Sequence, residues 1–245
     1  MLAVFKKDPL GRIACIKWLV TFVMGAVTYI FLRFCNKITI SGTEILHALD
    51  NRDVLFVSNH QTYFVDVIAM YHTFNSAHWG FKDHINVPLY LLAPRLNNYY
   101  VAAEETMKAG LIPKILANVG SVSIQRTWRD KGQSVNRQVR FADITNIGLA
   151  LNDGWVITFP QGTTQPGAPG RRGVTLIVKK YKPIVVPIVI DGFGEAFQKK
   201  NILPRKLFGH IKLRIKEPLE LDSNEDADTI LARIMAAIEQ GPEVE

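Results

Sequence analysis

The longest apolar stretch of the chain lies near the N-terminus, between Ile13 and Leu32. Lys17 is its only charged residue, and Trp18 to Leu32 carries no charge at all. A helix needs roughly 20 apolar residues to cross the hydrocarbon core of a bilayer, so this stretch has about the minimum length for a full span. Trp18 and Tyr29 near its ends are typical of membrane interfaces. We therefore expect residues 1–38 to form a membrane-anchoring helical segment that crosses the bilayer or enters one leaflet.

This segment could also be a cleaved signal peptide or a buried core helix. Residues 33–37, which follow the apolar stretch, lack the small side chains of a signal-peptidase site. This absence favours a retained anchor over a signal peptide. Basic residues flank the stretch on both sides, so the distribution of positive charge does not determine its orientation.

After residue 39, short apolar runs alternate with helical spacings of apolar residues. The runs predicted as strands are Val54–Val57, Ser121–Ile124, Trp155–Phe159, Pro183–Ile190 and Ile211–Ile215. Helices are predicted over 135–151 with Ser134 as N-cap, over Gly173–Tyr181, and from near Asp222 towards the C-terminus. This alternation predicts an α/β domain over residues 39–245, with a largely parallel or mixed sheet flanked by helices. The active site of such a domain is expected in the loops at the strand ends.

The net charge of +7 favours an anionic partner, either nucleic acid or an anionic membrane surface. The apolar N-terminal segment favours the membrane. Lysine and arginine are scattered along the chain without the aromatic–basic signature of a nucleic-acid module, so we expect membrane lipids and no nucleic acid as partners. Cys15 and Cys35 would lie about 30 Å apart on one helix. A disulfide needs Cα atoms within about 7 Å, so we expect free thiols, which fits a catalytic domain facing the cytoplasm.

A histidine and an aspartate follow the predicted strand Val54–Val57. His60 lies in the loop at the strand end, and Asp66 is expected in the first turn of the next helix. A carboxylate there can orient the imidazole and stabilise its protonated form, while the imidazole removes a proton from a hydroxyl group. Taken alone, the pair is also compatible with an ordinary hydrogen-bonded loop histidine beside a helix-capping aspartate.

Three further segments have their own chemistry. Phe159–Thr164 places a Pro/Gly turn after a strand, where free backbone N–H groups could bind an oxyanion. Gly120–Arg126 is a strand that ends in an arginine able to grip phosphate or carboxylate. Val186–Ile190 is an apolar strand interrupted by proline, for which a packing role is expected. Each of these segments also has an ordinary structural explanation, as a tight turn, a surface arginine or a core strand.

Together and in this order, the four segments resemble the glycerolipid acyltransferase family, which includes the enzyme that makes phosphatidate from lysophosphatidate. That family carries His-x-x-x-x-Asp, Gly-x-x-x-Ile-x-Arg and Phe-Pro-Glu-Gly-Thr blocks and a Val-Pro-Ile strand, and the resemblance covers roughly residues 40 to 215. It implies catalysis by His60 and Asp66. The residues that it places around the substrate are Arg126, Gln161, Gly162, Thr163, Arg171 and Arg172.

The chain departs from the family pattern at four places. Five residues separate His60 from Asp66, one more than in the family. Gln161 stands where the family has glutamate, and Thr164 where arginine usually follows Gly-Thr. Ala103 stands where a family lysine is usual. Several charges expected around an acceptor phosphate are therefore missing.

The resemblance implies acyl transfer from acyl-CoA or acyl-ACP, as co-substrate, to the hydroxyl of a lysophospholipid, with 1-acylglycerol-3-phosphate as the leading acceptor. It implies no resident cofactor and no metal, and acyl carrier protein is a conceivable partner. The missing charges keep open an acceptor without phosphate, such as an acyl-amino-acid lipid. A hydrolase that transfers the acyl group to water, and a non-catalytic membrane protein that binds lipid, also stay open.

Overall fold

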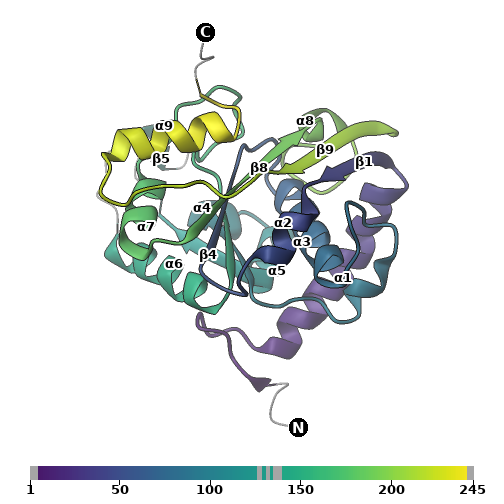
Figure 1. Cartoon of the computed structure of the whole chain (residues 1–245). Helices are drawn as coiled ribbons and strands as arrows, with labels where there is room; N and C mark the ends of the chain where they lie inside the picture. The colour runs from purple at the N-terminus through teal and green to yellow at the C-terminus, as the bar shows by residue number, and fades with distance from the viewer. Residues whose placement is uncertain (1–4, 126–128, 131–132, 135–139, 242–245) are drawn as a thin grey trace.

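A seven-stranded mixed sheet runs through the middle of the protein (Figure 1). The computed structural model describes residues 5–125, 129–130, 133–134 and 140–241. The strands, in sheet order, are β1 (Asn36–Ser41), β9 (Gly209–Ile215), β8 (Ile184–Asp191), β2 (Val54–Ser58), β7 (Trp155–Thr158), β3 (Asn98–Ala103) and β4 (Ser121–Ile124). Only β8 and β9 pair antiparallel within this sheet. The carboxyl ends of β8, β2, β7, β3 and β4 therefore meet at one edge of the sheet, where β1 and β9 begin.

Helices cover both faces of the sheet (Figure 1). One face carries α6 (Phe141–Asp153), α7 (Gly173–Tyr181) and α9 (Ala227–Ala237). The other carries α1 (Ala14–Arg33), α2 (Thr43–Ala48), α3 (Val65–His78) and α5 (Leu111–Gly120). Shorter elements are α4 (Glu104–Lys108), α8 (Phe193–Ala196), the 3-10 helix η2 (Pro88–Leu91) and the small pair β5 (Arg129–Asp130) and β6 (Gln133–Ser134).

The central strand β2 shows why four consecutive residues, Val54 to Val57, are apolar. Val54 and Phe56 pack in the core below α1 and α3, whereas Leu55 and Val57 pack in the core below α6, α7 and α9. Side chains of a strand alternate between the two faces of a sheet, and here both faces are covered by helices. The uninterrupted apolar run thus follows from a parallel sheet between two helical layers, and the mixed α/β fold predicted from the sequence is confirmed.

Several predicted elements agree closely with the structure. The predicted strand Ser121–Ile124 and helix Gly173–Tyr181 have the observed bounds. The strand predicted over Pro183–Ile190 shifts by one residue to form β8. This strand is continuous through Pro187, which pairs with Val57 of β2, and the Pro187 carbonyl accepts a hydrogen bond from the Lys216 N–H at 2.9 Å. Both cysteines are free, as expected.

Two predicted helix starts are wrong. The backbone of Arg140 is extended, so α6 begins at Phe141, and the predicted cap Ser134 belongs instead to the strand β6. At the C-terminus, α9 begins at Ala227 because the Asp226 carboxylate accepts the Asp228 N–H at 2.8 Å and caps the helix there. At the C-terminus, apolar spacing alone therefore extended the predicted helix across the turn that precedes α9.

The N-terminal helix α1 lies along the α/β domain. One face is buried against it, through Lys17, Thr21, Thr28, Tyr29 and Leu32. The helix starts near the amino ends of the strands, where the Arg12 guanidinium donates to the Ser121 carbonyl, and it ends at the edge where β1 begins. It is long and apolar enough to cross a membrane by length and composition, a test that core helices and signal sequences also pass.

A buried hydrogen-bond chain ties α1 to its neighbours. The Thr28 hydroxyl donates to the Met24 carbonyl at 2.7 Å and lies 3.0 Å from His72 Nε2, while His72 Nδ1 lies 2.8 Å from the Tyr90 hydroxyl. Because the Thr28 proton is already used, His72 Nε2 carries the proton and Nδ1 accepts from Tyr90. Burial lowers the pKa of His72 to about 4, so the ring is neutral near pH 7. This neutral chain holds α1 to α3 and η2.

Candidate active site

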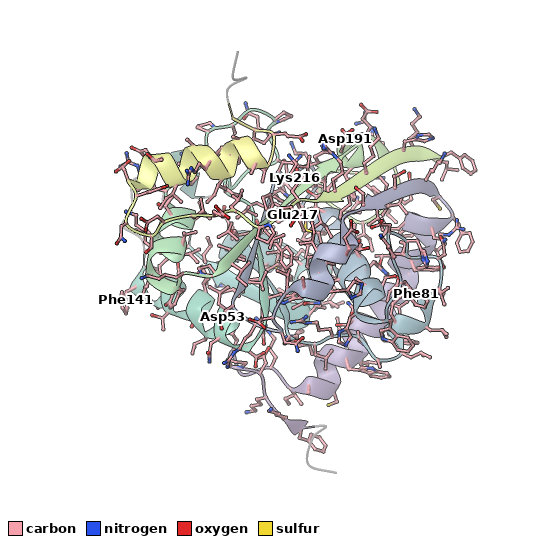
Figure 2. The ribbon with its side chains drawn as sticks, in the orientation of Figure 1. Asp53, Phe81, Phe141, Asp191, Lys216 and Glu217 are labelled. Carbon is pink, nitrogen blue, oxygen red and sulfur yellow. The ribbon has the colours of Figure 1, made fainter. Side chains whose placement is uncertain are left out.

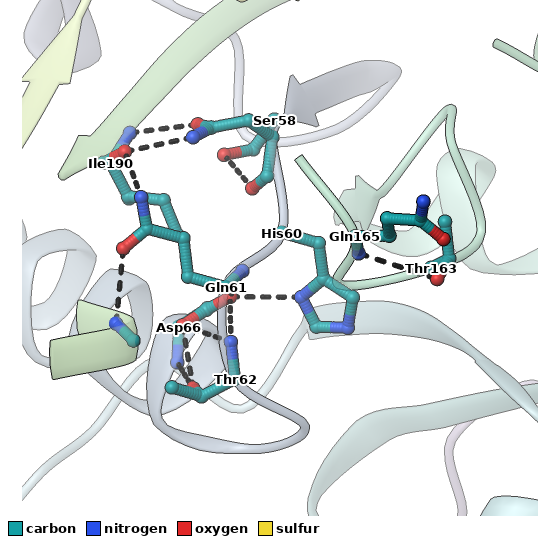
Figure 3. Close-up of polar contacts among 10 residues, drawn as sticks. Ser58, His60, Gln61, Thr62, Asp66, Thr163, Gln165 and Ile190 are labelled. Atoms are coloured by element: carbon teal, nitrogen blue, oxygen red, sulfur yellow. Dashed lines mark hydrogen bonds and ion pairs between the residues drawn. The ribbon is translucent and has the colours of Figure 1, made fainter. Parts of the chain in front are cut away.

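His60 lies in the loop after β2, at the edge where the parallel strands end. Its Nδ1 lies 2.8 Å from Oδ2 of Asp66, in the first turn of α3 (Figure 3). A carboxylate only accepts hydrogen bonds, so Nδ1 carries a proton, and in the neutral imidazole the lone pair is then on Nε2. The extra residue between His60 and Asp66, relative to the family pattern, thus does not prevent the pairing.

The Asp66 carboxylate is fully buried and accepts hydrogen bonds from its own loop. Oδ2 accepts the Gln61 N–H at 2.7 Å and the Thr62 N–H at 3.0 Å. Oδ1 accepts the Thr62 hydroxyl at 2.6 Å. Together with His60, these donors satisfy the charge inside the protein and fix the direction of the carboxylate. The loop between His60 and Asp66 is therefore shaped around this carboxylate.

Two amide side chains attach the catalytic loop to the neighbouring strand β8. Asn59 donates to the Ile190 carbonyl at 2.8 Å and accepts the Ile190 N–H at 2.9 Å, in the manner of a backbone pair (Figure 3). Gln61 donates to the same carbonyl at 3.2 Å and accepts the Gly194 N–H at 3.1 Å. The sequence reasoning missed these residues, although polar side chains directly after a buried strand were a signal for them.

The other side of the imidazole rests on Phe159. The two rings stack with centroids 3.9 Å apart and planes 20° apart. Phe159 begins a turn in which its carbonyl accepts the Gly162 N–H at 2.9 Å, with Pro160 at the second position, which proline favours. Gly162 has φ +64, a conformation that glycine adopts without steric cost. The glycine of the Phe159–Thr164 segment is thus required by the turn, and its N–H is already bonded to the Phe159 carbonyl.

A second glycine explains part of the Gly120–Arg126 motif. A Cβ added at Gly120 would lie 2.3 Å from the Asn98 carbonyl oxygen and 2.6 Å from the Tyr71 hydroxyl. Only glycine lets the end of α5 approach the start of β3 so closely. Arg126 itself lies outside the described residues, so its predicted contact with substrate stays a prediction.

A cavity of about 370 Å³ opens beside His60 at the strand ends. Of the residues predicted to surround the substrate, the lining includes Gly162, Thr163, Arg171 and Arg172 together with His60. Ala103 and Thr164, two of the positions where family charges are missing, also line it. The structure thus brings these segments, far apart in the sequence, around one space. Asp143, which the sequence reasoning missed, adds a carboxylate to the lining.

Gln161 and Arg172, which were predicted to contact substrate, are held by protein partners. The Gln161 side chain is buried outside the lining, where its Nε2 donates to the Ala168 carbonyl at 2.9 Å and to Oε1 of Gln240 at 3.0 Å. The Arg172 guanidinium makes a bidentate pair with Asp228 at 2.8 and 2.5 Å. A ligand must therefore compete with Asp228 for Arg172, whereas Gln161 holds the loop that forms the cavity wall.

Comparison with known proteins places this arrangement in a family. The sequence pattern of the family described as "Acyltransferase" matches residues 37–191, more than half of the chain, including the loop of His60 and the turn after β7. The chain belongs to the acyltransferase family. No curated protein sequence matches it.

Among solved structures, the fold of this acyltransferase is similar to the crystal structure of the 1-acyl-sn-glycerophosphate (LPA) acyltransferase PlsC from Thermotoga maritima. The TM-score is 0.54 at 17% sequence identity, over 95% of this chain and 82% of that one. At this identity the likeness supports the fold, and it extends over the N-terminal helix as well as the α/β domain. Membership of the acyltransferase family, which the sequence motifs indicated, is confirmed by the family match.

Proposed function

We propose that this acyltransferase moves a fatty acyl group from a thioester, acyl-CoA or acyl-ACP, to the hydroxyl of a lysophospholipid, with 1-acylglycerol-3-phosphate as the leading acceptor. The observation that carries the proposal is the pair formed by His60 and the fully buried Asp66 at the mouth of a large cavity. The pair leaves Nε2 of His60 free to act as a base, because Nδ1–H is held by the carboxylate.

In the proposed reaction, Nε2 of His60 takes the proton of the acceptor hydroxyl while its oxygen attacks the thioester carbon. The tetrahedral intermediate then expels the thiolate, which recovers the proton from Nε2 and leaves as a thiol. Asp66 stabilises the imidazolium formed between these steps. The histidine returns to its starting state, so the chemistry requires no covalent acyl-enzyme intermediate.

The oxyanion of the intermediate needs a hydrogen-bond donor near Phe159. The N–H of Gly162 already donates to the Phe159 carbonyl, so it does not fill this role. We propose the N–H of Thr163 instead, since Thr163 lines the cavity and no acceptor for this N–H is recorded among the described residues. This assignment moves the predicted oxyanion donor from Gly162 to Thr163.

The acyl chain is proposed to occupy a second, narrower cavity of about 60 Å³ behind the catalytic loop. Tyr63, Val67 and Tyr100 line both cavities, so the two spaces are neighbours. The narrower one is bordered by side chains of α1, α3 and α5, which are largely apolar, as burial of an alkyl chain requires. In this arrangement α1 forms one wall of the acyl site.

An acceptor without phosphate is the second candidate, and the missing family charges favour it. Ala103 and Thr164 replace the cationic groups expected by family resemblance, and Asp143 adds a buried carboxylate whose Oδ2 accepts the Gln125 N–H at 2.8 Å. A phosphate would be repelled by Asp143 and attracted by Arg171.

Membrane attachment is proposed to use the exposed face of α1. Apolar side chains 41 to 62% exposed follow one another along it at helical spacing: Ile16, Leu19, Val23, Val27, Ile30 and Phe34. Because the opposite face is packed against the domain, α1 would lie within one leaflet rather than cross the bilayer. A cytoplasmic position of the catalytic domain stays a prediction.

The test offers labelled acyl-CoA and acyl-ACP, with a panel of acceptors, to the solubilised wild type, His60→Ala and the control His47→Ala. His47 is an exposed histidine on α2. Loss of general base catalysis should lower the rate by about 10²–10⁴-fold in His60→Ala only. Transfer to lysophosphatidate supports the leading acceptor, and transfer to a hydroxylated acyl-amino-acid lipid alone supports the second. Free fatty acid as the main product, or full activity of His60→Ala, contradicts the proposal.

A further inference from the structure

A strongly basic segment lies next to the catalytic loop. Between Glu195 and Glu217 the chain carries seven lysine or arginine residues and no acidic residue. Four of them are exposed in the loop between α8 and β9: Lys199, Lys200, Arg205 and Lys206. No ion pair is recorded for these four among the residues that the structure describes. The loop therefore presents uncompensated positive charge to the solvent.

This loop is well ordered by its own contacts. Phe197 and Ile202 are buried beneath it, and the Gln198 N–H donates to the Leu203 carbonyl at 3.0 Å. Its link to the active site is direct, because the Lys199 carbonyl accepts the N–H of Tyr63 at 2.9 Å. Tyr63 lines both cavities. The basic side chains thus project from a fixed loop beside the entrance to the active site.

Apolar side chains are exposed in the same loop. Leu203, Leu207 and Phe208 are 48, 59 and 76% exposed. The Phe208 N–H donates to the Cys35 carbonyl at 2.6 Å, and Asn36 pairs with Gly209, so the end of the loop meets the end of α1. In Figure 1, β1, β9 and α8 lie together at the upper right. The exposed apolar stripe of α1, which ends at Phe34, is therefore continued by this loop.

The direction of the strands places this surface at the catalytic edge. Figure 2 labels Asp53, just before β2, and Asp191, the last residue of β8, at opposite ends of the strands. His60 follows β2 at the Asp191 end, and β1 and β9 start there. A flat ligand that covers the loop and the end of α1 would thus lie beside the entrance of the catalytic cavity.

We infer that the 199–208 loop, together with the C-terminal end of α1, docks on an anionic lipid surface. Exposed apolar side chains among uncompensated lysines and arginines are the combination that enters the interface of an anionic membrane. An acidic protein would be attracted by the charge, but the continuity with the apolar stripe of α1 favours a lipid. The loop would hold the active site against the leaflet that supplies its lipid substrates. This docking does not depend on which acceptor is used.

The test measures partition of the full-length protein onto vesicles of phosphatidylcholine alone or mixed with phosphatidylglycerol. The charge variant is Lys199→Gln/Lys200→Gln/Arg205→Gln/Lys206→Gln. Its matched control, Arg52→Gln/Lys179→Gln/Lys180→Gln/Lys182→Gln, removes the same charge at the opposite ends of the strands. At about 1 kcal/mol for each basic residue near the surface, the charge variant should lose anionic binding by roughly 10²–10³-fold. The control should keep most of its preference for anionic vesicles.

A second variant tests the apolar part of the surface. Leu207→Ser/Phe208→Asn should weaken binding to both kinds of vesicle by about 10²-fold. Phe208 has φ +56, which asparagine tolerates, so this change does not strain the loop. Equal anionic preference in the wild type and the charge variant would overturn the inference. The inference would also be overturned if the charge variant bound vesicles like the wild type and lost turnover only with acyl-ACP as donor. That result would assign the loop to binding of the carrier protein.

Discussion

Replacing Asp66 by asparagine separates the orientation of His60 from the electrostatic support that Asp66 gives it. An amide oxygen at the Oδ2 position can still accept His60 Nδ1–H and the Gln61 N–H. The amide NH₂ then faces the Thr62 hydroxyl, which is 2.6 Å from Oδ1 and can turn to accept. The catalytic tautomer is therefore retained in Asp66→Asn, and only the negative charge is lost.

The size of the effect follows from the geometry. Two unit charges about 4 Å apart interact by about 4 kcal/mol at an effective dielectric constant of 20, which sets an upper limit for the support of the imidazolium. At 1.36 kcal/mol for each factor of ten, kcat should fall by about 10²–10³-fold in Asp66→Asn. Asp66→Ala also leaves buried N–H donors unpaired at about 1–3 kcal/mol each, so it should lower the free energy of unfolding as well.

The assay is acyl transfer with the acceptor found for the wild type, together with thermal unfolding of each variant. Thr62→Val serves as a control, because it keeps the carboxylate and should change kcat by less than about tenfold. In Thr62→Val/Asp66→Asn the Gln61 and Thr62 N–H groups still require an acceptor at the Oδ2 position, so the amide oxygen stays towards His60 and kcat should match that of Asp66→Asn within about tenfold. Wild-type kcat in a folded Asp66→Asn would refute the reasoning.

Three further predictions concern buried groups around the site. Gln161→Glu should lower the free energy of unfolding by about 3 kcal/mol at neutral pH, since a buried carboxylate would face the Ala168 carbonyl and Oε1 of Gln240. Denaturant titration measures this change. Increased transfer to lysophosphatidate without destabilisation would contradict the prediction. The folded-state pKa of His72, about 4, lies below its value of 6.5 in the unfolded chain. Between these two pH values the unfolded state binds more protons than the folded state. The free energy of unfolding therefore falls by about 3 kcal/mol as pH drops from 6.5 to 4. Thermal unfolding across this range should show a weaker pH dependence in His72→Gln, and an unchanged one would argue against this role. Val67 lines both cavities, so Val67→Phe should shift donor preference to shorter acyl chains, by about fourfold in kcat/KM for each excluded methylene. Competition between donors of different chain length tests this. An unchanged preference would place the acyl chain elsewhere.

The sequence determined the type of fold and the location of the chemistry. Fully buried strands such as Val54–Val57 are recognisable because both faces of a parallel sheet require apolar residues. The loop containing His60 was recognisable because active sites of such sheets lie at the carboxyl ends of strands. Local signals also fixed Gly173–Tyr181, whose apolar positions and bounds need no knowledge of distant contacts.

The Asp226 cap that begins α9 is not encoded by apolar spacing. The elements that follow His60, which include α3, β3 and α5, were likewise assigned only in the structure. Tertiary structure likewise decided the role of Gln161. Its motif position indicated contact with substrate, but its amide is paired with Gln240, which lies 79 residues away in the sequence. Whether a polar side chain faces a cavity or a neighbouring loop depends on contacts between distant segments, and a linear pattern does not contain them.

The N-terminal segment shows the same division. Its length and lack of charge determined that it forms an apolar helix, since both are local properties. That one face of α1 packs on the domain while the other stays exposed was decided by the residues it meets, such as His72 on α3. The 199–208 loop became part of the same surface only because β1 and β9 pair side by side. Composition thus indicated a membrane partner, and strand pairing determined which surface is available to meet it.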